Sequence, residues 1–140
     1  MFRQPQRSRL ALPTQLSQEG TTPSIAFVAP IVPGKTDLLR QAAQSQAPGG
    51  ERRAAYEASR ERHGITREAS WIQPTPMGDL TIVYIEADDL EAMFDGLGSS
   101  QDPFDVWFRE QTREVHGINI EDGVPSPDQI LTFEAHTTVA

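Results

Sequence analysis

Two stretches of the chain are apolar at consecutive positions, without the regular polar interruptions of a half-exposed strand. Residues 24–32 (SIAFVAPIV) place apolar side chains on both alternations, and residues 80–86 (LTIVYIE) do so apart from Thr81 and Glu86. Successive side chains of a strand point to opposite faces of the sheet, so both stretches predict central strands buried on two faces.

Two further strands are predicted, one beside a turn and one near the end of the chain. Residues 65–73 (ITREASWIQ) carry Arg67 and Glu68 among apolar positions, a mixture that favours an edge strand. Residues 74–79 (PTPMGD) have the composition of a turn and predict a hairpin between the second and third strands. Residues 129–135 (QILTFEA) form the last predicted strand.

Apolar stripes at helical spacing fill the intervals between these strands. The first interval holds two helical segments separated by residues 47–50 (APGG), and the third helix is predicted to end at Gly96 and Gly98. Asp88, and Asp102 with the proline after it, have the character of helix starts. The predicted helices cover residues 36–46, 51–62, 88–97 and 102–116.

A ten-residue unit occurs twice, as residues 57–66 (EASRERHGIT) and residues 110–119 (EQTREVHGIN). The copies share Glu, Arg, Glu, His, Gly and Ile in register. In each copy a charged helix is predicted to end at His-Gly, because glycine suits the left-handed position that follows a helix. An isoleucine then opens the next extended segment. The repeat indicates two copies of a βαβ half.

The order of elements is β-α-β-β-α-β, in which each α is a helix broken once. Two right-handed crossovers joined by a hairpin predict an α+β fold, a ferredoxin-like βαββαβ antiparallel sheet with strand order 4-1-3-2 and the helices on one face. Because the helices cover only one face, the second apolar face of the two central strands would meet water. A second copy packed sheet to sheet is the simplest cover, which predicts a homodimer.

Composition assigns the rest of the chain and removes several functional classes. The 140 residues suit one domain over residues 24–136, preceded by a flexible tail, residues 1–23, rich in Gln, Ser, Thr and Pro. The net charge of -8 argues against a nucleic-acid partner. The absence of cysteine removes thiolate nucleophiles and cysteine-based metal sites. No apolar run has the length of a membrane span or the form of a signal peptide, so a cytoplasmic location without membrane contact is expected.

Five short motifs stand out within residues 25–133. They are PGK at 33–35, R-x-x-H-G-I at 60–65, WIQPTPMGD at 71–79, VYIEADD at 83–89 and DPFDVWF at 102–108. Together they resemble a group of small uncharacterised bacterial proteins in the dimeric α/β barrel superfamily, in which two ferredoxin-like subunits pack sheet to sheet. That superfamily includes cofactor-independent monooxygenases, isomerases, heme-dependent enzymes and ligand-sensing domains, so the resemblance does not select one activity.

His63 and His116 are candidates for acid–base chemistry or metal binding, because imidazole titrates near neutral pH. Each also precedes a glycine at a helix end, where a histidine bonds the last carbonyl groups and favours the negative end of the helix dipole. In the expected topology the two helices run antiparallel, which places the histidines at opposite ends of the sheet and leaves no shared metal site. His116 follows an aromatic-rich helix and is the preferred catalytic residue, and His63 is a candidate ligand-binding residue.

Glu68, Trp71, Tyr84 and Trp107 complete the candidate site. A carboxylate turned into an enclosed pocket has a raised pKa and can act as a base, whereas an edge strand offers Glu68 a cross-strand ion pair instead. Trp71 and Tyr84 lie on hairpin-paired strands, and each ring is large enough to orient a planar ligand. Trp107 belongs to the aromatic-rich helix and is a candidate for the same pocket.

Two functions of different classes follow from these observations. The first is a homodimeric protein that binds a small organic molecule between sheet and helices, as a cofactor-independent monooxygenase or an isomerase with Glu68 and His116 as catalytic residues. The second is a non-catalytic dimerisation or interaction module. Neither function calls for a cofactor or a metal, and the sequence contains no GxGxxG or HExxH signature.

Overall fold

A three-stranded antiparallel sheet forms the centre of the protein in a computed structural model that describes residues 22–135. The strands are β1 (Ser24–Pro30), β2 (Ile65–Thr75) and β3 (Gly78–Ala87), in the order β1-β3-β2. The predicted hairpin of β2 and β3 is confirmed, with Thr75 opposite Gly78 at its turn. The relative positions predicted for the first three strands are also confirmed, and the fold class is α+β.

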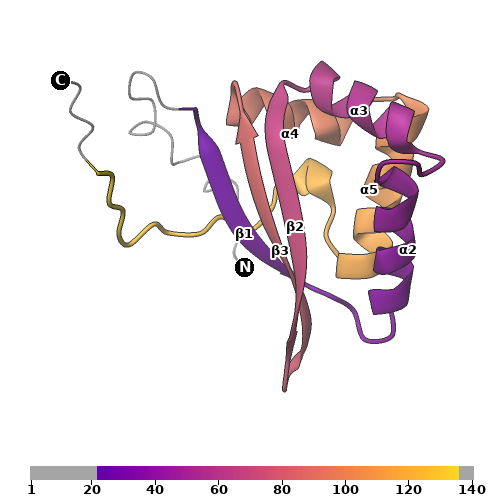
Figure 1. Cartoon of the computed structure of the whole chain (residues 1–140), viewed down its shortest axis with the longest axis horizontal. Helices are drawn as coiled ribbons and strands as arrows, with labels where there is room; N and C mark the ends of the chain where they lie inside the picture. Colours follow the sequence, from indigo (N-terminus) through magenta and orange to yellow (C-terminus); the bar gives the residue numbers. More distant parts are fainter. Residues whose placement is uncertain (1–21, 136–140) are drawn as a thin grey trace.

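Four helices accompany the sheet in the part of the chain that the structure describes, and each predicted break between helices is present. They are α2 (Thr36–Gln46), α3 (Arg53–Arg62), α4 (Leu90–Ser99) and α5 (Pro103–His116), followed by the short 3-10 helix η2 (Ile120–Asp122). Figure 1 shows α2, α3 and α5 on one side of the sheet. No helix within residues 22–135 combines the length and the apolar character that crossing a membrane requires.

Aspartate side chains start α4 and α5. Asp102 accepts a hydrogen bond from the Phe104 amide at 2.9 Å, as predicted. The predicted cap of α4 was wrong by one position, because Asp89 and not Asp88 accepts from the Ala92 amide, at 3.0 Å. The amide of Asp88 donates to the Gly64 carbonyl beside the start of β2, which ties Asp88 to the sheet and leaves Asp89 to start the helix.

The predicted end of α4 at its glycines was also wrong, since the helix continues to Ser99. A Cβ added at Gly96 would lie 2.6 Å from Nδ1 of His63. Gly96 therefore permits a close approach between α4 and the end of α3 and does not mark a helix terminus. The buried side of α4 packs into the main core cluster with Leu90, Met93, Phe94 and Leu97.

The predicted fourth strand does not form, which is the main correction to the fold. Residues 129–135 pair with no strand of the described chain, and Ile130, Leu131 and Phe133 are 92%, 83% and 85% exposed. In Figure 1 this final segment, drawn in gold, runs away from the helices to the far side of the sheet. A strand requires a paired neighbour, and this segment does not return along β1. Strand β1 is therefore an edge, and the four-stranded ferredoxin-like order is incomplete in one chain.

The repeated unit keeps both of its helix ends but only one of its strands. Gly64 and Gly117 have positive φ angles of 72° and 70°, as expected for glycine after a helix. Ile65 opens β2, whereas Ile118 leads into the 3-10 helix. Residues 1–21 of the predicted tail and the last domain residue, 136, lie outside the described part of the chain.

The predicted second apolar face of the sheet is present on the side away from the helices. The strand register places Ala26, Val28, Trp71, Ile82 and Tyr84 on this face. Val28 is 45% exposed and Trp71 is 53% exposed. We call this surface the open sheet face; Ile82 and Tyr84 on its central strand are half-buried, whereas Val28 and Trp71 on the outer strands are exposed.

Candidate functional site

A cavity of about 640 Å³ lies between the helix-facing side of the sheet and the helices, and it is partly open to solvent. The sheet contributes Phe27 and Val83, α4 contributes Phe94, and α5 contributes Phe108. A volume of this size is within the range of small-molecule sites, which are mostly apolar with a few polar groups. The cavity therefore has the size and the lining of a ligand site.

An ion pair between α3 and β2 forms the charged part of the cavity wall. Nε of Arg60 donates to Oε1 of Glu68 at 2.8 Å, and a terminal nitrogen of Arg60 donates to Oε2 at 3.3 Å. The hydroxyl of Tyr56 donates to the same Oε1 at 2.7 Å. The side chains of Arg60 and Glu68 are only 8% and 14% exposed, so the pair is largely withdrawn from water. Glu68 is thus ion-paired, but its partner belongs to a helix and not, as the cross-strand alternative had predicted, to a neighbouring strand.

Aromatic rings surround the Arg60 guanidinium and fix its position. Its central carbon lies 4.8 Å from the ring centre of Tyr56 and 4.5 Å from that of Phe108. Burial acts to lower the pKa of Arg60, but the Glu68 carboxylate outweighs this effect and leaves that pKa above its ordinary value. Burial and the neighbouring Glu68 raise the pKa of Tyr56 to about 12, so its hydroxyl remains a donor at neutral pH.

Two buried polar atoms in the cavity wall have no hydrogen-bond partner. They are Oγ1 of Thr81 on β3 and Oε1 of Gln111 on α5. Thr81 is only 5% exposed, and its position opposite Ala29 and Ile72 directs it toward the helices. Buried polar groups in folded proteins are normally paired, since an unpaired one costs about 1–3 kcal/mol. Both atoms are closed off from solvent by the side chains around them, so each costs stability and neither is open to a molecule in the cavity.

His116 lies at another part of the wall, at the end of α5. Its Nδ1 is 3.0 Å from the carbonyl oxygen of Pro30, and because a carbonyl only accepts, Nδ1 carries the hydrogen. Burial lowers the pKa of His116 below its ordinary value of 6.5, against the opposing effect of that hydrogen bond. The neutral ring leaves Nε2 with a free lone pair, so Nε2 can accept a proton.

The predicted aromatic candidates separate into two groups. Trp107 lines the cavity, with the guanidinium of Arg52 at 4.0 Å from its ring centre. Trp71 is at the cavity margin on edge strand β2, but strand alternation directs its side chain to the open sheet face. Tyr84 points to that face as well and donates to Glu86 at 2.5 Å. The expected shared pocket of Trp71 and Tyr84 between sheet and helices therefore does not form.

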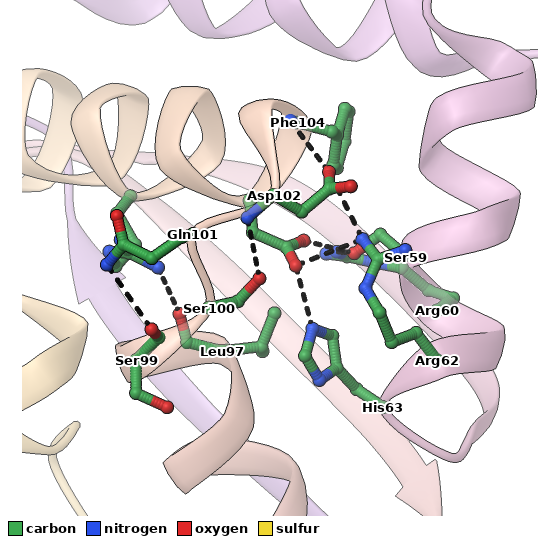
Figure 2. Close-up of polar contacts among 12 residues, drawn as sticks. Ser59, Arg60, Arg62, His63, Leu97, Ser99, Ser100, Gln101, Asp102 and Phe104 are labelled. Carbon is green, nitrogen blue, oxygen red and sulfur yellow. Dashed lines mark hydrogen bonds and ion pairs between the residues drawn. The ribbon is translucent and has the colours of Figure 1, made fainter.

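His63 lies outside the cavity, in a polar cluster that joins the end of α3 to the first turn of α5 (Figure 2). Nε2 of His63 is 2.9 Å from Oδ2 of Asp105, and the Ser59 hydroxyl donates to Oδ1 at 2.6 Å. Arg62 donates to Oδ2 at 3.0 Å. We call these four residues the Asp105 cluster. Asp105 is fully buried, so the cluster satisfies a carboxylate that the packing of α3 on α5 removes from water.

The Asp105 carboxylate remains ionised despite its burial. Burial acts to raise the pKa of Asp105, but hydrogen bonds from Ser100, Ser59, His63 and Arg62 together hold that pKa well below its usual value of 3.8. Ser59 and His63 both bond to the Asp105 carboxylate and not to each other, so the cluster lacks the serine–histidine–aspartate order of a nucleophilic triad. Its geometry accounts for a structural role.

The predicted separation of the two histidines is present. His63 contacts Asp105 in the first turn of α5, and His116 is the last residue of that helix. Three helical turns, roughly 16 Å, separate the two ends. Within residues 22–135 no group of three or more His, Cys, Asp or Glu side chains is arranged to hold a metal ion.

Sequence reasoning identified Glu68, Trp107 and His116 as cavity residues but missed Tyr56, Arg60 and Thr81. Tyr56 and Arg60 are four positions apart on α3, a spacing that places them on the same helix face. With Glu68 as a candidate on the strand after this helix, that spacing indicates that Tyr56 and Arg60 belong to the same site as Glu68. No local sequence pattern identifies Thr81, because threonine is common in strands. That its hydroxyl lacks a hydrogen-bond partner depends on the tertiary structure.

Comparison with known proteins adds no family to these observations. The chain matches no protein-family model, no curated protein and no solved structure at a significant level. The structure itself shows a small α+β fold with a three-stranded antiparallel sheet and helices.

Proposed function

We propose that the protein binds a small organic molecule in the cavity between the sheet and the helices. The observation that carries this proposal is a cavity of about 640 Å³, partly open to solvent, whose wall combines aromatic rings with the largely buried Arg60–Glu68 pair. Ligand pockets are typically of this kind, mostly apolar with a few polar groups held in fixed positions.

The chemistry that we infer for this site is cofactor-independent, as a monooxygenase or an isomerase. Both reactions begin with removal of a proton from the bound molecule, and Nε2 of His116 is the group with a free lone pair. Glu68 is held by Arg60 and Tyr56, so its contribution is to fix those two donors toward the cavity. The resemblance of the sequence to the dimeric α/β barrel superfamily, whose members include such enzymes, is the reason for proposing these two reactions.

A pair of tryptophan substitutions tests the cavity with the neutral fluorescent probe phenylnaphthylamine. Ala43 is exposed on α2 and lines the cavity, so Ala43→Trp narrows it, whereas Ala54→Trp places the same ring on an exposed part of α3 outside it. We expect the wild-type protein and Ala54→Trp to bind the probe equally, and Ala43→Trp to bind about tenfold more weakly, or about 1.4 kcal/mol. Fluorescence titration gives the three dissociation constants.

Binding at the open sheet face is the competing explanation for probe fluorescence, and Val28→Lys separates the two sites. Val28 is 45% exposed at that face and does not line the cavity. Loss of probe binding in Val28→Lys with full binding in Ala43→Trp would reject the proposed cavity site. The opposite result supports it.

The second candidate function, a dimerisation or interaction module, has its own supporting observation. The open sheet face is apolar, and the segment that follows η2 exposes Ile130, Leu131 and Phe133. Exposed apolar surfaces of this kind mark protein interfaces. We propose that a second copy covers the open sheet face, so that the protein is a homodimer, and light scattering of the full chain tests this.

A further inference from the structure

The outer edge of β1 carries backbone groups that β3 does not use. At one end of the ladder between the two strands, the amide of Ile31 donates to the Asp79 carbonyl at 3.0 Å. At the other end, the amide of Ala87 donates to the Pro23 carbonyl at 3.1 Å. Hydrogen-bonded pairs alternate along an antiparallel ladder, so the odd-numbered residues of β1 bond to β3. The even-numbered residues therefore direct their amides and carbonyls outward.

The end of α5 covers one part of this outer edge. Pro30 has no amide, and its carbonyl accepts from Nδ1 of His116 at 3.0 Å. The amide of Val32 donates to the Val115 carbonyl at 2.8 Å. The outward residues that remain are Ser24, Ala26 and Val28. No hydrogen bond from elsewhere in the described chain reaches their outward backbone groups. Residues 24–28 are thus a free edge with about the length of an ordinary strand.

Residues 127–135, which we call the terminal arm, have the character of a strand without a partner. Every residue of the arm is exposed, and none shares a backbone hydrogen bond with the rest of residues 22–135. Ile130, Leu131 and Phe133 place apolar side chains on both alternations of an extended chain. An apolar segment with unpaired backbone groups is suited to join the edge of a sheet. One chain therefore has both a free edge and an unpaired strand.

The terminal arm leads away from its own molecule. Val124, just before it, packs against the core, which fixes the point where the segment leaves the domain. Pro125 and Pro127 hold φ near about -65° and keep the residues before them extended, which favours a projecting segment. In Figure 1 the segment ends beyond β1, on the side opposite to the helices. Fully extended, the arm spans roughly 30 Å, enough to reach across a second copy on the open sheet face.

We propose, on the basis of the homodimer proposed above, that two copies exchange their terminal arms, each arm adding a fourth strand to the free β1 edge of the other copy. The added strand bonds to the outward amides and carbonyls of Ser24, Ala26 and Val28 and covers the apolar side chains of the arm. Both copies make the same contacts about a two-fold axis, so the assembly closes at two chains. The partner supplies the strand that a single chain lacks.

Introduced cysteines report which chain occupies the β1 edge, because the natural sequence contains no cysteine. Ala26→Cys, at an exposed edge position, is made in one chain, and Ile130→Cys, Leu131→Cys or Phe133→Cys in a second chain with a tag of different mass. The two chains are unfolded together in urea, refolded and oxidised. We expect a disulfide between the two different chains for at least one arm position. Ala54→Cys, exposed on α3, replaces Ala26→Cys as the matched control and should give no such product.

The same cysteines placed in one chain distinguish exchange from a return of the arm to its own edge. Exchange predicts that the double-cysteine chain forms a covalent dimer with two disulfides. A closed monomer would show that each arm pairs with its own β1, which overturns the proposal. Absence of the mixed disulfide at all three arm positions overturns it as well.

Two further variants measure the contribution of the exchanged strand to the dimer. Ala26→Pro removes an outward amide but no bond to β3, and a chain ending at Ser126 removes the arm. We expect each to raise the dissociation constant of the dimer about tenfold or more, at least the factor of roughly one net hydrogen bond. Because both changes remove the same contact, Ala26→Pro in the shortened chain should add little further weakening. Light scattering over a dilution series gives the four constants.

The outcomes separate arm exchange from the functions proposed above. Unchanged dissociation constants in both variants would reject the exchange while leaving the dimer through the open sheet face in place. A wild-type monomer would reject both the exchange and the homodimer. Binding of phenylnaphthylamine in the cavity does not depend on the arm, so its titration judges the ligand site independently. A mixed disulfide together with the weakened dimer in both variants supports the proposal.

Discussion

At the scale of single residues, the ion pair of Arg60 and Glu68 connects helix α3 to edge strand β2, and the two opposite charges neutralise each other. Arg60 is 7% exposed and contacts Tyr56 and Phe108 with its guanidinium faces. A buried pair contributes little net stability by itself, but removal of one partner leaves an uncompensated charge in a dry environment. Replacing one of the two residues is therefore expected to destabilise the protein, whereas replacing both with apolar residues is expected to be tolerated.

Glu68→Ala is expected to lower the free energy of unfolding by about 3–5 kcal/mol, because Arg60 loses its counterion. The double variant Glu68→Leu/Arg60→Met should recover most of that loss, since both charges are removed together. Glu57→Ala is the matched control: Glu57 pairs with Arg53 at the surface, where an ion pair contributes less than about 1 kcal/mol. Urea unfolding measures all three, and equal losses for Glu68→Ala and Glu57→Ala would contradict the prediction.

The buried Asp105 carboxylate makes the free energy of unfolding depend on pH in the acidic range. Its pKa is well below 3.8 in the folded protein, whereas the unfolded chain has an ordinary aspartate pKa of about 3.9. Below about pH 4 the unfolded chain therefore binds a proton that the folded protein does not, and stability falls as the pH falls. The contribution of Asp105 is fully present above about pH 5.

Asp105→Asn is expected to remove this dependence. At neutral pH the variant should be less stable by about 2–3 kcal/mol, because Ser59, His63 and Arg62 lose a charged acceptor. Between about pH 4 and pH 3 the wild-type protein should lose about 1 kcal/mol more than the variant. Urea unfolding at a series of pH values checks both statements, and parallel curves for the two proteins would show that Asp105 is not responsible.

At the scale of elements, α4 meets the end of α3 through a glycine in the middle of the helix. The His63 ring has little freedom to move away, since its side chain is 7% exposed and is held by Asp105 at 2.9 Å. A methyl group at Gly96 would lie 2.6 Å from that ring. The distance between these two helices is thus set by the absence of a side chain at Gly96.

Gly96→Ala is expected to destabilise the protein by about 1–3 kcal/mol through this clash, although the same change in an open helix stabilises by about 0.5–1 kcal/mol. In a His63→Ala background the clash is absent, and Gly96→Ala should become neutral or stabilising. A double-mutant cycle by urea unfolding isolates the coupling of the two positions. An increase in stability on Gly96→Ala in the wild-type background would contradict the close contact.

At the scale of the whole molecule, one chain leaves an apolar sheet face and an apolar terminal segment without cover. Val28 on β1 and Trp71 on β2 are exposed on the two outer strands of the open sheet face, and Ile130 and Phe133 are exposed beyond η2. Covering such surfaces with a second copy would bury them without a change of fold. The homodimer is therefore the assembly that we expect.

Light scattering at micromolar concentration should give twice the mass of one chain. Val28→Lys is expected to shift the protein to a monomer, because a lysine in the middle of an apolar interface loses its hydration. Ala54→Lys adds the same charge on an exposed part of α3 and should leave the dimer intact. The midpoint of urea unfolding should rise with protein concentration for the wild-type chain. A folded wild-type monomer would contradict the sheet-to-sheet assembly.

The local pattern of the sequence determined most of the elements of this protein. Two-sided apolar runs located β1 and β3, turn composition located the hairpin, and an aspartate followed by proline located the start of α5. These features depend on neighbours within a few residues, so periodicity and capping express them directly. The same patterns predicted the open sheet face, because helices on one side cannot cover the other.

Tertiary packing decided which polar atoms meet and where the last segment goes. His63 and Asp105 are 42 positions apart, and nothing near either residue in the sequence indicates the contact. Arg60 and Glu68 form the charged part of the cavity wall only because packing brings α3 against β2. Residues 129–135 have the composition of a strand, but they do not return along the free edge of β1, and without a paired neighbour no strand forms. The sequence thus determined the elements, while packing between residues far apart in the chain determined the cavity and the polar contacts around it.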